Sequence, residues 1–277
     1  MTSAAGGTRR SVLAEGIEAL PVFTFAHHAG AIAAADLRKL ARDPTELFTR
    51  ATQPLLWFLV FGQVFSRTRV IPTGSLSYLE FMAPGILAQS VLFAAIFYGI
   101  AVIWERDLGI VHKLLVSPAS RSSLVVGKAI AAGARGLVQG VLVVAIALVM
   151  GVRVRTDLAG LAGIVAGVFL GSALFATFSL VVACVVKTRE RFMGIGQVLT
   201  MPLFFASNAI YPISMMPPWL ADVARVNPLT YLVDALRTLL VVGAASAVGV
   251  PVDFAVMAVV FAALVAVAAT LYPGLAR

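Results

Sequence analysis

Runs of residues without a single charge constrain this chain more than any other feature of its sequence. A helix needs about 20 mostly apolar residues to cross a bilayer, and about 17 to 25 are tolerated. Six charge-free runs of this order or longer lie at residues 51–66, 81–104, 136–152, 158–186, 192–221 and 254–276. Prolines and Asn208 interrupt the fifth run near residue 212. The sequence therefore predicts six transmembrane helices, and an even number places both termini on the same side.

Composition excludes a water-soluble globule. Hydrophobic residues make up 60% of the 277 residues and charged residues only 12%, whereas a soluble domain carries about a quarter charged residues. Too little polar surface is then available to cover a soluble core. The single cysteine, Cys184, excludes a disulfide framework and a thiolate metal cluster. We therefore expect an all-α membrane protein that is embedded in the lipid membrane.

The basic residues set the predicted orientation. The net charge is +8, and in a membrane protein such an excess reflects basic cytoplasmic loops rather than a nucleic-acid partner. Fourteen Lys and Arg residues fall in the N-terminal region, the second-to-third and fourth-to-fifth linkers and at Arg277, against six on the opposite side. We therefore predict a multi-pass protein of the cytoplasmic membrane with both termini in the cytoplasm and no nucleic-acid partner.

An amphipathic stretch precedes the first span. Its apolar residues share one helical face and its charged residues fall mostly on the other: Ala33, Leu37, Leu40 and Ala41 against Asp36, Arg38, Lys39 and Arg42. This pattern predicts a helix over 30–43 that lies in the cytoplasmic interface; an ordinary solvated helix is the alternative. We assign residues 1–50 as a cytoplasmic N-terminal region and 51–277 as the transmembrane domain.

Signatures of catalysis are missing from the sequence. Gly127 and Lys128 form the only Gly-Lys pair, but Ala129 follows them and Ser122 stands where a phosphate-binding loop needs its first glycine. The histidines lack metal-ligand spacing. Spans two, four and six carry none of the ionisable groups that ion-coupled carriers use. We predict no catalytic residue, metal or cofactor in this chain, and a hydrophobic or amphipathic substrate whose transport is powered from elsewhere.

The linker after the second span carries the first distinctive motif. Trp104 marks the membrane interface, and three charged residues follow at once. An apolar stripe at helical spacing comes next, and Pro118 ends this helix near Ser117. An exposed apolar stripe indicates a contact surface; the alternative is that it packs on the protein's own helices. The stripe consists of Ile110, Val111, Leu114 and Leu115.

The second motif lies between spans five and six, on the predicted external side. Prolines between residues 212 and 228 prevent one continuous helix, so we expect short helices that dip into the outer leaflet. Asn227 suits an N-cap and Pro228 the first helical position. Tyr231, Asp234 and Arg237 then recur along one side, where Asp234 and Arg237 can pair. An exposed ion pair without a function is the alternative.

Both segments resemble those of permeases of the ABC-2 type transporter family. In WERDLGIVHKLLVSPASRSSLVVGK the matching residues are Glu105, Gly109, Leu114 or Leu115, Ser117, Pro118, Arg121, Gly127 and Lys128. In PPWLADVARVNPLTYLVDALR they are Trp219, Leu220, Asn227, Pro228, Tyr231, Asp234, Ala235 and Arg237. QPLLWFLVFGQVF, residues 53–65, is similar to the first span of the family. The chain departs from the family pattern at His112 and Lys113, where an acidic or polar residue is usual.

The resemblance implies a fold and a set of partners. It implies an all-α membrane protein with six transmembrane helices, cytoplasmic termini, an N-terminal amphipathic interfacial helix and external re-entrant helices between spans five and six. It further implies a dimer with a second permease copy or paralogue, bound to two ABC ATPase subunits made as separate chains. ATP and Mg²⁺ are then bound by the partner ATPase.

The resemblance also suggests roles for single residues. We assign coupling to the ATPase to Glu105, Arg106, Asp107, Gly109, Ile110, Val111, Leu114, Leu115, Ser117, Pro118 and Arg121. We assign an external gate to Trp219, Asn227, Pro228, Tyr231, Asp234 and Arg237.

Export of a drug, antibiotic or lipid-like substrate is the function that this sequence predicts, and the likeness is greatest to the daunorubicin-resistance and antibiotic-exporter branch. Export of a polysaccharide or teichoic acid is the alternative within the family. A membrane-embedded lipid-modifying enzyme is more distant, because it would need paired acids or a nucleophile beside a base. An ion channel would need a charged or carbonyl-rich filter, and the sequence shows no such signature.

Overall fold

The computed structural model describes residues 21–42, 52–68, 71–116, 119–186 and 188–276. Within these ranges the regular elements are helices, with no β-strand. Four helices are long and apolar enough to cross a membrane: α4 (Tyr78–Asp107), α6 (Arg121–Val149), α7 (Leu158–Val185) and α11 (Val250–Leu271). They correspond to the predicted second, third, fourth and sixth spans, so the all-α membrane fold is confirmed at this level.

The predicted first and fifth spans are shorter helices. The first is helical over residues 52–68, with a π-helical turn, η1 (Trp57–Gly62), followed by α3 (Gln63–Thr68). The fifth is α8 (Arg189–Phe205), which ends before the interruption that was predicted near residue 212 and contains Pro202 within it. A total of six spans therefore stays a prediction.

The helix boundaries correct the sequence interpretation at both ends of the bundle. The third span was expected to begin at residue 136, but α6 begins at Arg121 and carries Lys128 and Arg135 within it. Likewise α4 extends beyond its charge-free run to include Glu80 and Glu105. A charge does not end a helix when another part of the fold supplies its partner, and a count of charge-free residues cannot detect that partner.

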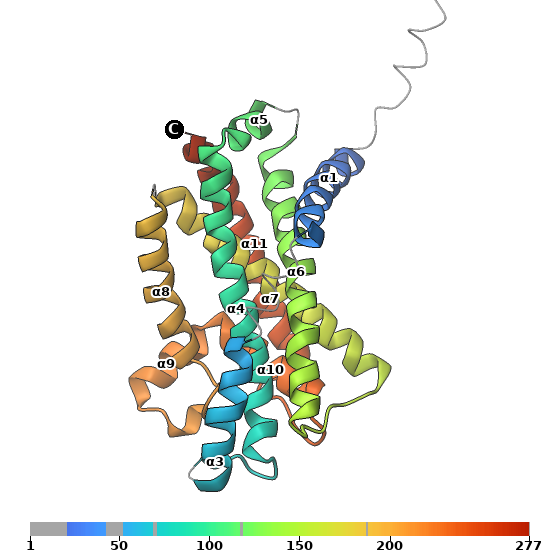
Figure 1. Ribbon diagram of the computed structural model, residues 1–277, viewed down its shortest axis with the longest axis vertical. Coiled ribbons are helices and arrows are strands. Elements are labelled where there is room, and N and C mark those ends of the chain that lie inside the picture. The colour runs from blue at the N-terminus through green and yellow to red at the C-terminus, as the bar shows by residue number, and fades with distance from the viewer. Residues whose placement is uncertain (1–20, 43–51, 69–70, 117–118, 187, 277) are drawn as a thin grey trace, which may run out of the picture.

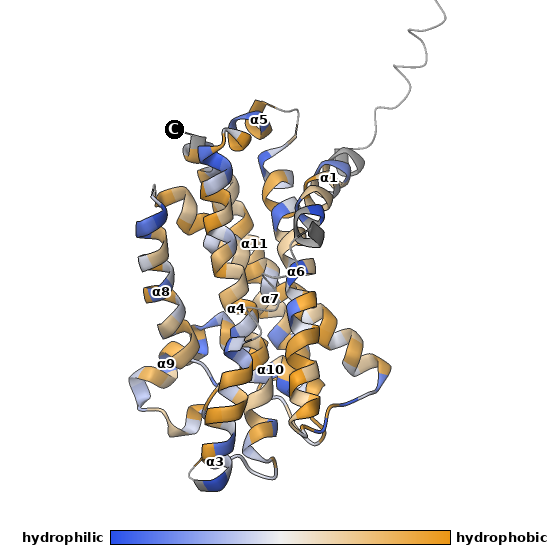
Figure 2. Cartoon of the chain, viewed as in Figure 1, coloured by the Kyte–Doolittle hydropathy of each residue, from blue (hydrophilic) through white to orange (hydrophobic). Residues whose placement is uncertain are grey.

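The two central helices, α4 and α7, pack closely against each other, while α6, α10 (Pro228–Leu240) and α11 lie around them (Figure 1). Small residues allow this approach. A Cβ atom at Gly99 would overlap the Ser179 hydroxyl of α7, and one at Gly136 would overlap Ser172. Helices in membranes use such small residues because close packing takes the place of the hydrophobic effect. Apolar residues occupy the middle of the long helices and hydrophilic ones gather towards their ends (Figure 2).

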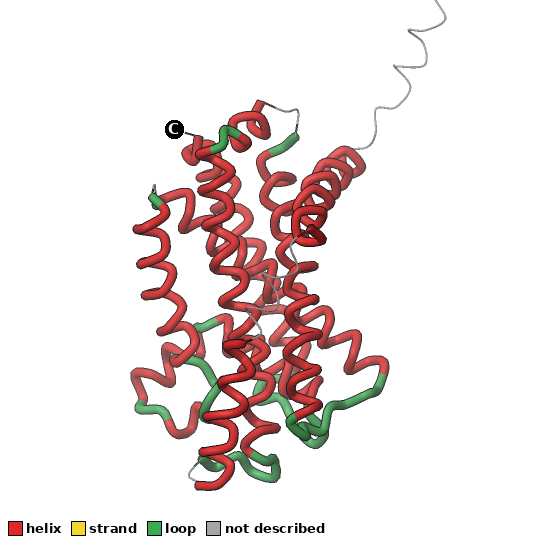
Figure 3. The backbone as a smooth tube through the Cα atoms, viewed as in Figure 1, coloured by secondary structure: helices red, strands yellow, loops and turns green. Residues whose placement is uncertain are grey.

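The elements divide between two ends of the molecule. One end, the α5 end, holds α1 (Pro21–Arg42), α5 (Ile110–Val116), the start of α8 and η3 (Tyr272–Ala276) (Figure 1). The other, the α10 end, holds α3, α9 (Pro218–Val226), α10 and most of the loops (Figure 3). This division agrees with the two sets of segments that the basic residues predicted to lie on opposite sides of a membrane.

The N-terminal helix is longer than expected and one of its residues faces the other way. Helix α1 begins at Pro21 rather than near residue 30 and packs on α6. Ala29 and Ala33 are buried there, and a Cβ atom at Gly127 would meet the Ala29 carbonyl. Asp36, expected on the solvated face, is buried against the bundle. The placement of α1 in a membrane interface remains a prediction.

The predicted external segment forms short helices, as its prolines indicated. A 3₁₀ turn, η2 (Ile213–Met215), precedes α9 and α10, which meet at Asn227 and Pro228. Helix α10 packs against α4, α7 and α11, so it fills the centre of its end of the bundle. Whether these helices re-enter a leaflet is still a prediction.

Candidate functional site

A sharp turn joins α4 to α5. Helix α4 ends at Asp107, and Gly109 then adopts a φ of +72°, a left-handed conformation that glycine reaches without strain. This explains a glycine at that place in the motif. Helix α5 ends at Val116, and the predicted coupling residues Ser117 and Pro118 lie outside the described residues.

The apolar stripe of α5 packs mainly on the protein itself. Val111 is fully buried, and Leu114 and Leu115 are half-buried against the core formed with α4 and η3. The expectation of an exposed stripe is therefore wrong, and its alternative holds, because Tyr272 and Leu275 of η3 join that core. The large apolar side chains exposed around this turn are Leu108, at 67%, and Val116, at 87%.

A buried charge cluster joins three helices beneath that turn. The Lys128 ammonium of α6 lies 2.6 Å from Glu105 Oε2 of α4 and 3.9 Å from Asp36 Oδ2 of α1. The Tyr98 hydroxyl donates a hydrogen bond to Asp36, and the Arg135 guanidinium lies 5.6 Å from the Tyr98 ring centroid. Buried charges persist only when paired and hydrogen-bonded. The cluster therefore fixes how α1, α4 and α6 meet.

A second, more exposed link connects α4 to the start of α8. Arg189 donates to Asp107 at 2.6 Å, and its guanidinium lies 3.6 Å from the Trp104 ring centroid. Arg106 also bonds to Asp107, at 2.8 Å. Because solvent reaches this link, salt screens it. Arg121, the last predicted coupling residue, is exposed where α6 begins.

At the α10 end, Asn227 holds two helices together. Its Oδ1 accepts from the Leu229 amide at 3.0 Å, as expected of an N-cap, and Pro228 occupies the first helical position. Its Nδ2 donates to the carbonyls of Leu203 and Ala206, at 2.7 and 2.8 Å. The same amide thus caps α10 and satisfies the open end of α8.

Asp234 and Arg237 are both buried, but they do not pair with each other. Arg237 donates to the Asn208 carbonyl at 2.6 Å and lies 4.0 Å from the Phe81 ring centroid. Asp234 accepts from the Ser246 hydroxyl at 2.7 Å and the Ala247 amide at 2.8 Å. The predicted ion pair is therefore wrong, and so is the exposed-pair alternative, because tertiary partners compete successfully with the local spacing.

The other two predicted gate residues lie nearer the surface. The Tyr231 hydroxyl donates to the Arg225 carbonyl at 2.6 Å, which ties α10 to α9, and Trp219 is exposed on α9. The six predicted gate residues thus share one end of the molecule without forming one polar cluster.

The sequence interpretation missed the link between Glu80 and Arg153. Glu80 completes a capping box with Ser77 at the start of α4 and accepts from Arg153 Nε at 2.7 Å. This hydrogen bond raises the pKa of Arg153 above its usual value. The S-x-x-E pattern was the available signal, but the partner in the loop after α6 was not visible from sequence.

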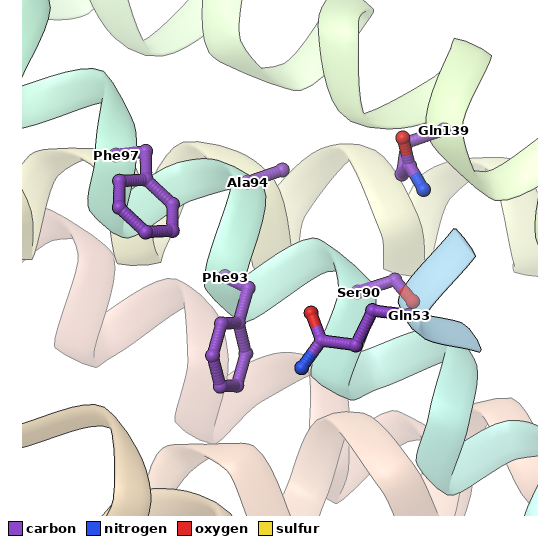
Figure 4. A pocket seen from close by; sticks show the side chains of 6 residues that line it. All are labelled: Gln53, Ser90, Phe93, Ala94, Phe97 and Gln139. Carbon is purple, nitrogen blue, oxygen red and sulfur yellow. The ribbon is translucent and has the colours of Figure 1, made fainter. Parts of the chain in front are cut away.

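A cavity opens along α4, midway between the two ends. It has a volume of about 240 Å³ and is lined by Gln53, Ser90, Phe93, Ala94, Phe97 and Gln139 (Figure 4). A second cavity, of about 170 Å³, shares Phe93 and Phe97 and extends towards α8, where Phe192, Met193, Gly196, Gln197 and Thr200 line it. No charged residue of the described chain lines either cavity. Sequence reasoning assigned no role to Gln139.

A metal centre has no support in the described ranges, where no three His, Cys, Asp or Glu residues gather at ligand distance. The polar side chains described above link helices to one another, and the uncharged cavities along α4 can bind a molecule.

We compared the sequence with those of known protein families and proteins. The sequence profile of the ABC-2 type transporter family matches residues 28–241. The chain is 30% identical over 206 residues to the ycf38 protein of Cyanophora paradoxa, whose name describes a transport permease, covering 73% of this chain and 70% of that one. It is 25% identical over 188 residues to the inner membrane transport permease YadH of Escherichia coli, covering 66% and 70%.

A drug-resistance protein is also among the relatives. The daunorubicin resistance ABC transporter permease protein DrrB1 of Streptomyces coeruleorubidus is 25% identical over 202 residues, covering 71% of this chain and 69% of that one.

Proposed function

Because the chain belongs to the ABC-2 type transporter family, we propose that it is the membrane permease subunit of an ATP-binding cassette exporter. Permeases of this family are membrane transport subunits that work with ABC ATPase partners and are not catalytic themselves. The observation that carries the proposal is the profile match over residues 28–241. In this proposal two copies of a separate ATPase bind ATP and Mg²⁺, and a second permease copy or paralogue completes the complex.

The α5 end is the proposed contact with the ATPase. Two exposed apolar side chains, Leu108 and Val116, lie at the same end of the molecule as the exposed Arg121 and the Trp104–Arg189–Asp107 link. Beneath them the charge cluster joins α1, α4 and α6. A displacement of α5 by the ATPase would therefore be transmitted to these three helices. The proposal places this end, and both termini, in the cytoplasm, in agreement with the basic residues.

The proposed fold has six spans, with 52–68 and α8 as the first and fifth. Helices α9 and α10 would then re-enter the outer leaflet and close the external end of the path. The buried Asp234 and Arg237 and the double bonding of Asn227 support a rigid closure there.

The proposed cargo is a hydrophobic or amphipathic drug, antibiotic or lipid-like molecule exported across the cytoplasmic membrane. The likeness to DrrB1 supports this class, and so does the uncharged lining of the cavities along α4. Export of a polysaccharide or teichoic acid is the alternative within the family.

A pair of substitutions tests the coupling role. Val116 is 87% exposed at the α5 end and Val226 is 79% exposed at the α10 end, so an aspartate is accommodated without disturbing the core at either position. Val116→Asp should abolish co-purification with the ATPase or transport-linked hydrolysis, while Val226→Asp should leave both intact. Leu114→Asp is a poorer test, because its half-buried position would also disturb folding. Equal behaviour of the two variants would remove the α5 end from the coupling role.

A further inference from the structure

Asp253 lies in the first turn of α11 and is fully buried, although aspartate is almost never fully buried unless it is paired. Its Oδ1 atom has no hydrogen bond to any residue that the structure describes. Its Oδ2 atom lies 3.2 Å from the Ser246 hydroxyl. Burial of an ionised carboxylate costs much free energy when neither donors nor a cation surround it. This side chain therefore requires a ligand that the surrounding residues do not supply.

The Ser246 hydroxyl lies between two carboxyl groups. It is 2.7 Å from Asp234 Oδ2 on α10 and 3.2 Å from Asp253 Oδ2 on α11. A hydroxyl has a single proton to donate, and the shorter distance assigns this proton to Asp234. The Ala247 amide also donates to Asp234, at 2.8 Å. Asp234 thus has the donors that an ionised carboxylate needs, whereas the contact of Asp253 with the hydroxyl oxygen requires a proton on Asp253 itself.

No basic side chain on the described elements that pack against α10 and α11 offsets these two acidic groups. Helix α7 and η3 contain no charged residue, and the basic residues of α6 lie towards the α5 end. The remaining arginines near α10 contact other groups: Arg237 the Asn208 carbonyl, Arg153 Glu80 and Arg155 Asp157. Glu80, the acidic residue of α4 at this end, is therefore paired. Asp234 is left as the charged group that acts on Asp253.

We propose that Asp253 is a proton-binding site that links α11 to α10. The carboxylic acid donates to the Ser246 hydroxyl, which donates in turn to the Asp234 carboxylate. Because Ser246 belongs to the loop between the two helices, this chain of hydrogen bonds holds three segments together. Release of the proton to water would leave two carboxylates that repel each other and share one hydroxyl proton, and the contact between α10 and α11 would weaken. The inference does not depend on the function of the chain as a permease or on its cargo.

Infrared spectroscopy of the full chain detects the proton directly, because a carboxylic acid has a carbonyl stretching band that a carboxylate lacks. The protein is held in an alkyl maltoside detergent, which contributes no carbonyl group. The variants are Asp253→Asn and, as a matched control, Asp222→Asn, which changes an exposed aspartate on α9. At neutral pH the difference spectrum between wild type and Asp253→Asn should contain the carboxylic acid band. The difference spectrum with Asp222→Asn should lack it.

Unfolding by denaturant across a range of pH gives an independent readout. In the unfolded chain an aspartate ionises above about pH 4, whereas the folded wild type keeps the proton on Asp253, so that folding takes up one proton. Stability is therefore lost as the pH rises. From about pH 5 to pH 8 the unfolding equilibrium constant of the wild type should increase by up to tenfold per pH unit relative to that of Asp253→Asn. The ratio of wild type to Asp222→Asn should stay constant.

A metal cation is the competing ligand, since it would also satisfy the two carboxyl groups. Added Na⁺, Mg²⁺ or Ca²⁺ should shift the unfolding of wild type and Asp253→Asn equally, and a stabilisation of the wild type alone would replace the proton with that cation. Absence of the infrared band, or a ratio of wild type to Asp253→Asn that does not change with pH, would also overturn the inference. So would failure of Asp253→Asn to fold, because asparagine reproduces the size and neutrality of the protonated group.

Discussion

The two ends of the molecule both bury charged side chains, but they satisfy them differently. At the α5 end, Lys128 meets the carboxylates of Glu105 and Asp36, so charge meets charge across three helices. On helix α10 at the other end, Arg237 donates to the Asn208 carbonyl and Asp234 accepts from the Ala247 amide and the Ser246 hydroxyl, so neither charge meets an opposite one. The charge pair at that end joins Glu80 to Arg153 instead. A change on one helix of the α5 end can thus be compensated by a side chain on another. At the α10 end no side-chain substitution can supply a missing carbonyl.

Removal of Lys128 should give the largest effect. Lys128→Met takes away the cation that pairs with two buried carboxylates, and breaking a buried pair in this way costs about 3–5 kcal/mol of unfolding free energy. The double variant Lys128→Met with Glu105→Gln should recover much of that loss. Thermal unfolding of the purified chain measures both. If the double variant is as unstable as the single one, the α5 end does not behave as a charge pair.

Arg237→Lys should follow in size and should show no such rescue. Lysine cannot reproduce the planar group that bonds to the Asn208 carbonyl and lies on the Phe81 ring. An unsatisfied buried acceptor costs about 1–3 kcal/mol, so the unfolding temperature should fall. Asp234→Asn is the accompanying test, because removing the neighbouring charge should not restore the Arg237→Lys protein. Recovery in that double variant would show an ion pair after all.

Asn227 gives a smaller effect that separates two roles of one side chain. Asn227→Asp keeps the acceptor that caps α10 but loses the donors to Leu203 and Ala206, whereas Asn227→Ala loses all three bonds. Loss of an N-cap alone costs about 0.5–2 kcal/mol. The alanine variant should therefore unfold at a lower temperature than the aspartate variant. The reverse order would mean that the link to α8 outweighs the cap.

The exposed link at the α5 end should matter least for stability. Asp107→Asn removes the negative charge that faces Arg106 and Arg189 and one of the two oxygens that accept from them, where solvent and salt already screen the interaction. The unfolding temperature should stay within error of the wild type at physiological salt. A drop comparable with that of Lys128→Met would show that Asp107 belongs to the buried cluster.

The sequence predicted the helical membrane fold and four of its spans because charge-free runs report directly on what a bilayer tolerates. It misplaced the start of α6, since the partner of Lys128 lies 23 residues earlier in the chain, on another helix. It also misjudged Asp36, whose buried partners on α4 and α6 cannot be seen in a local helical pattern.

The candidate sites were predictable only in part. The Asn227 cap followed from local rules and is present, whereas Asp234 and Arg237 found partners that depend on the fold. The apolar face of α5 was visible, but η3, which covers it, comes from the far end of the chain. Gln139 resembles any soft polar residue in a span, and only the rotation of α6 shows that it faces a cavity.

The central claim is that the α5 end meets the ATPase, and site-directed cross-linking tests it most directly. In a Cys184→Ser background, Val116→Cys and Val226→Cys each place one reactive thiol at opposite ends of the molecule. With the ATPase bound and a short bifunctional reagent added, we predict a cross-linked permease–ATPase product from Val116→Cys and none from Val226→Cys. A product from Val226→Cys alone, or equal products from both, would contradict the claim.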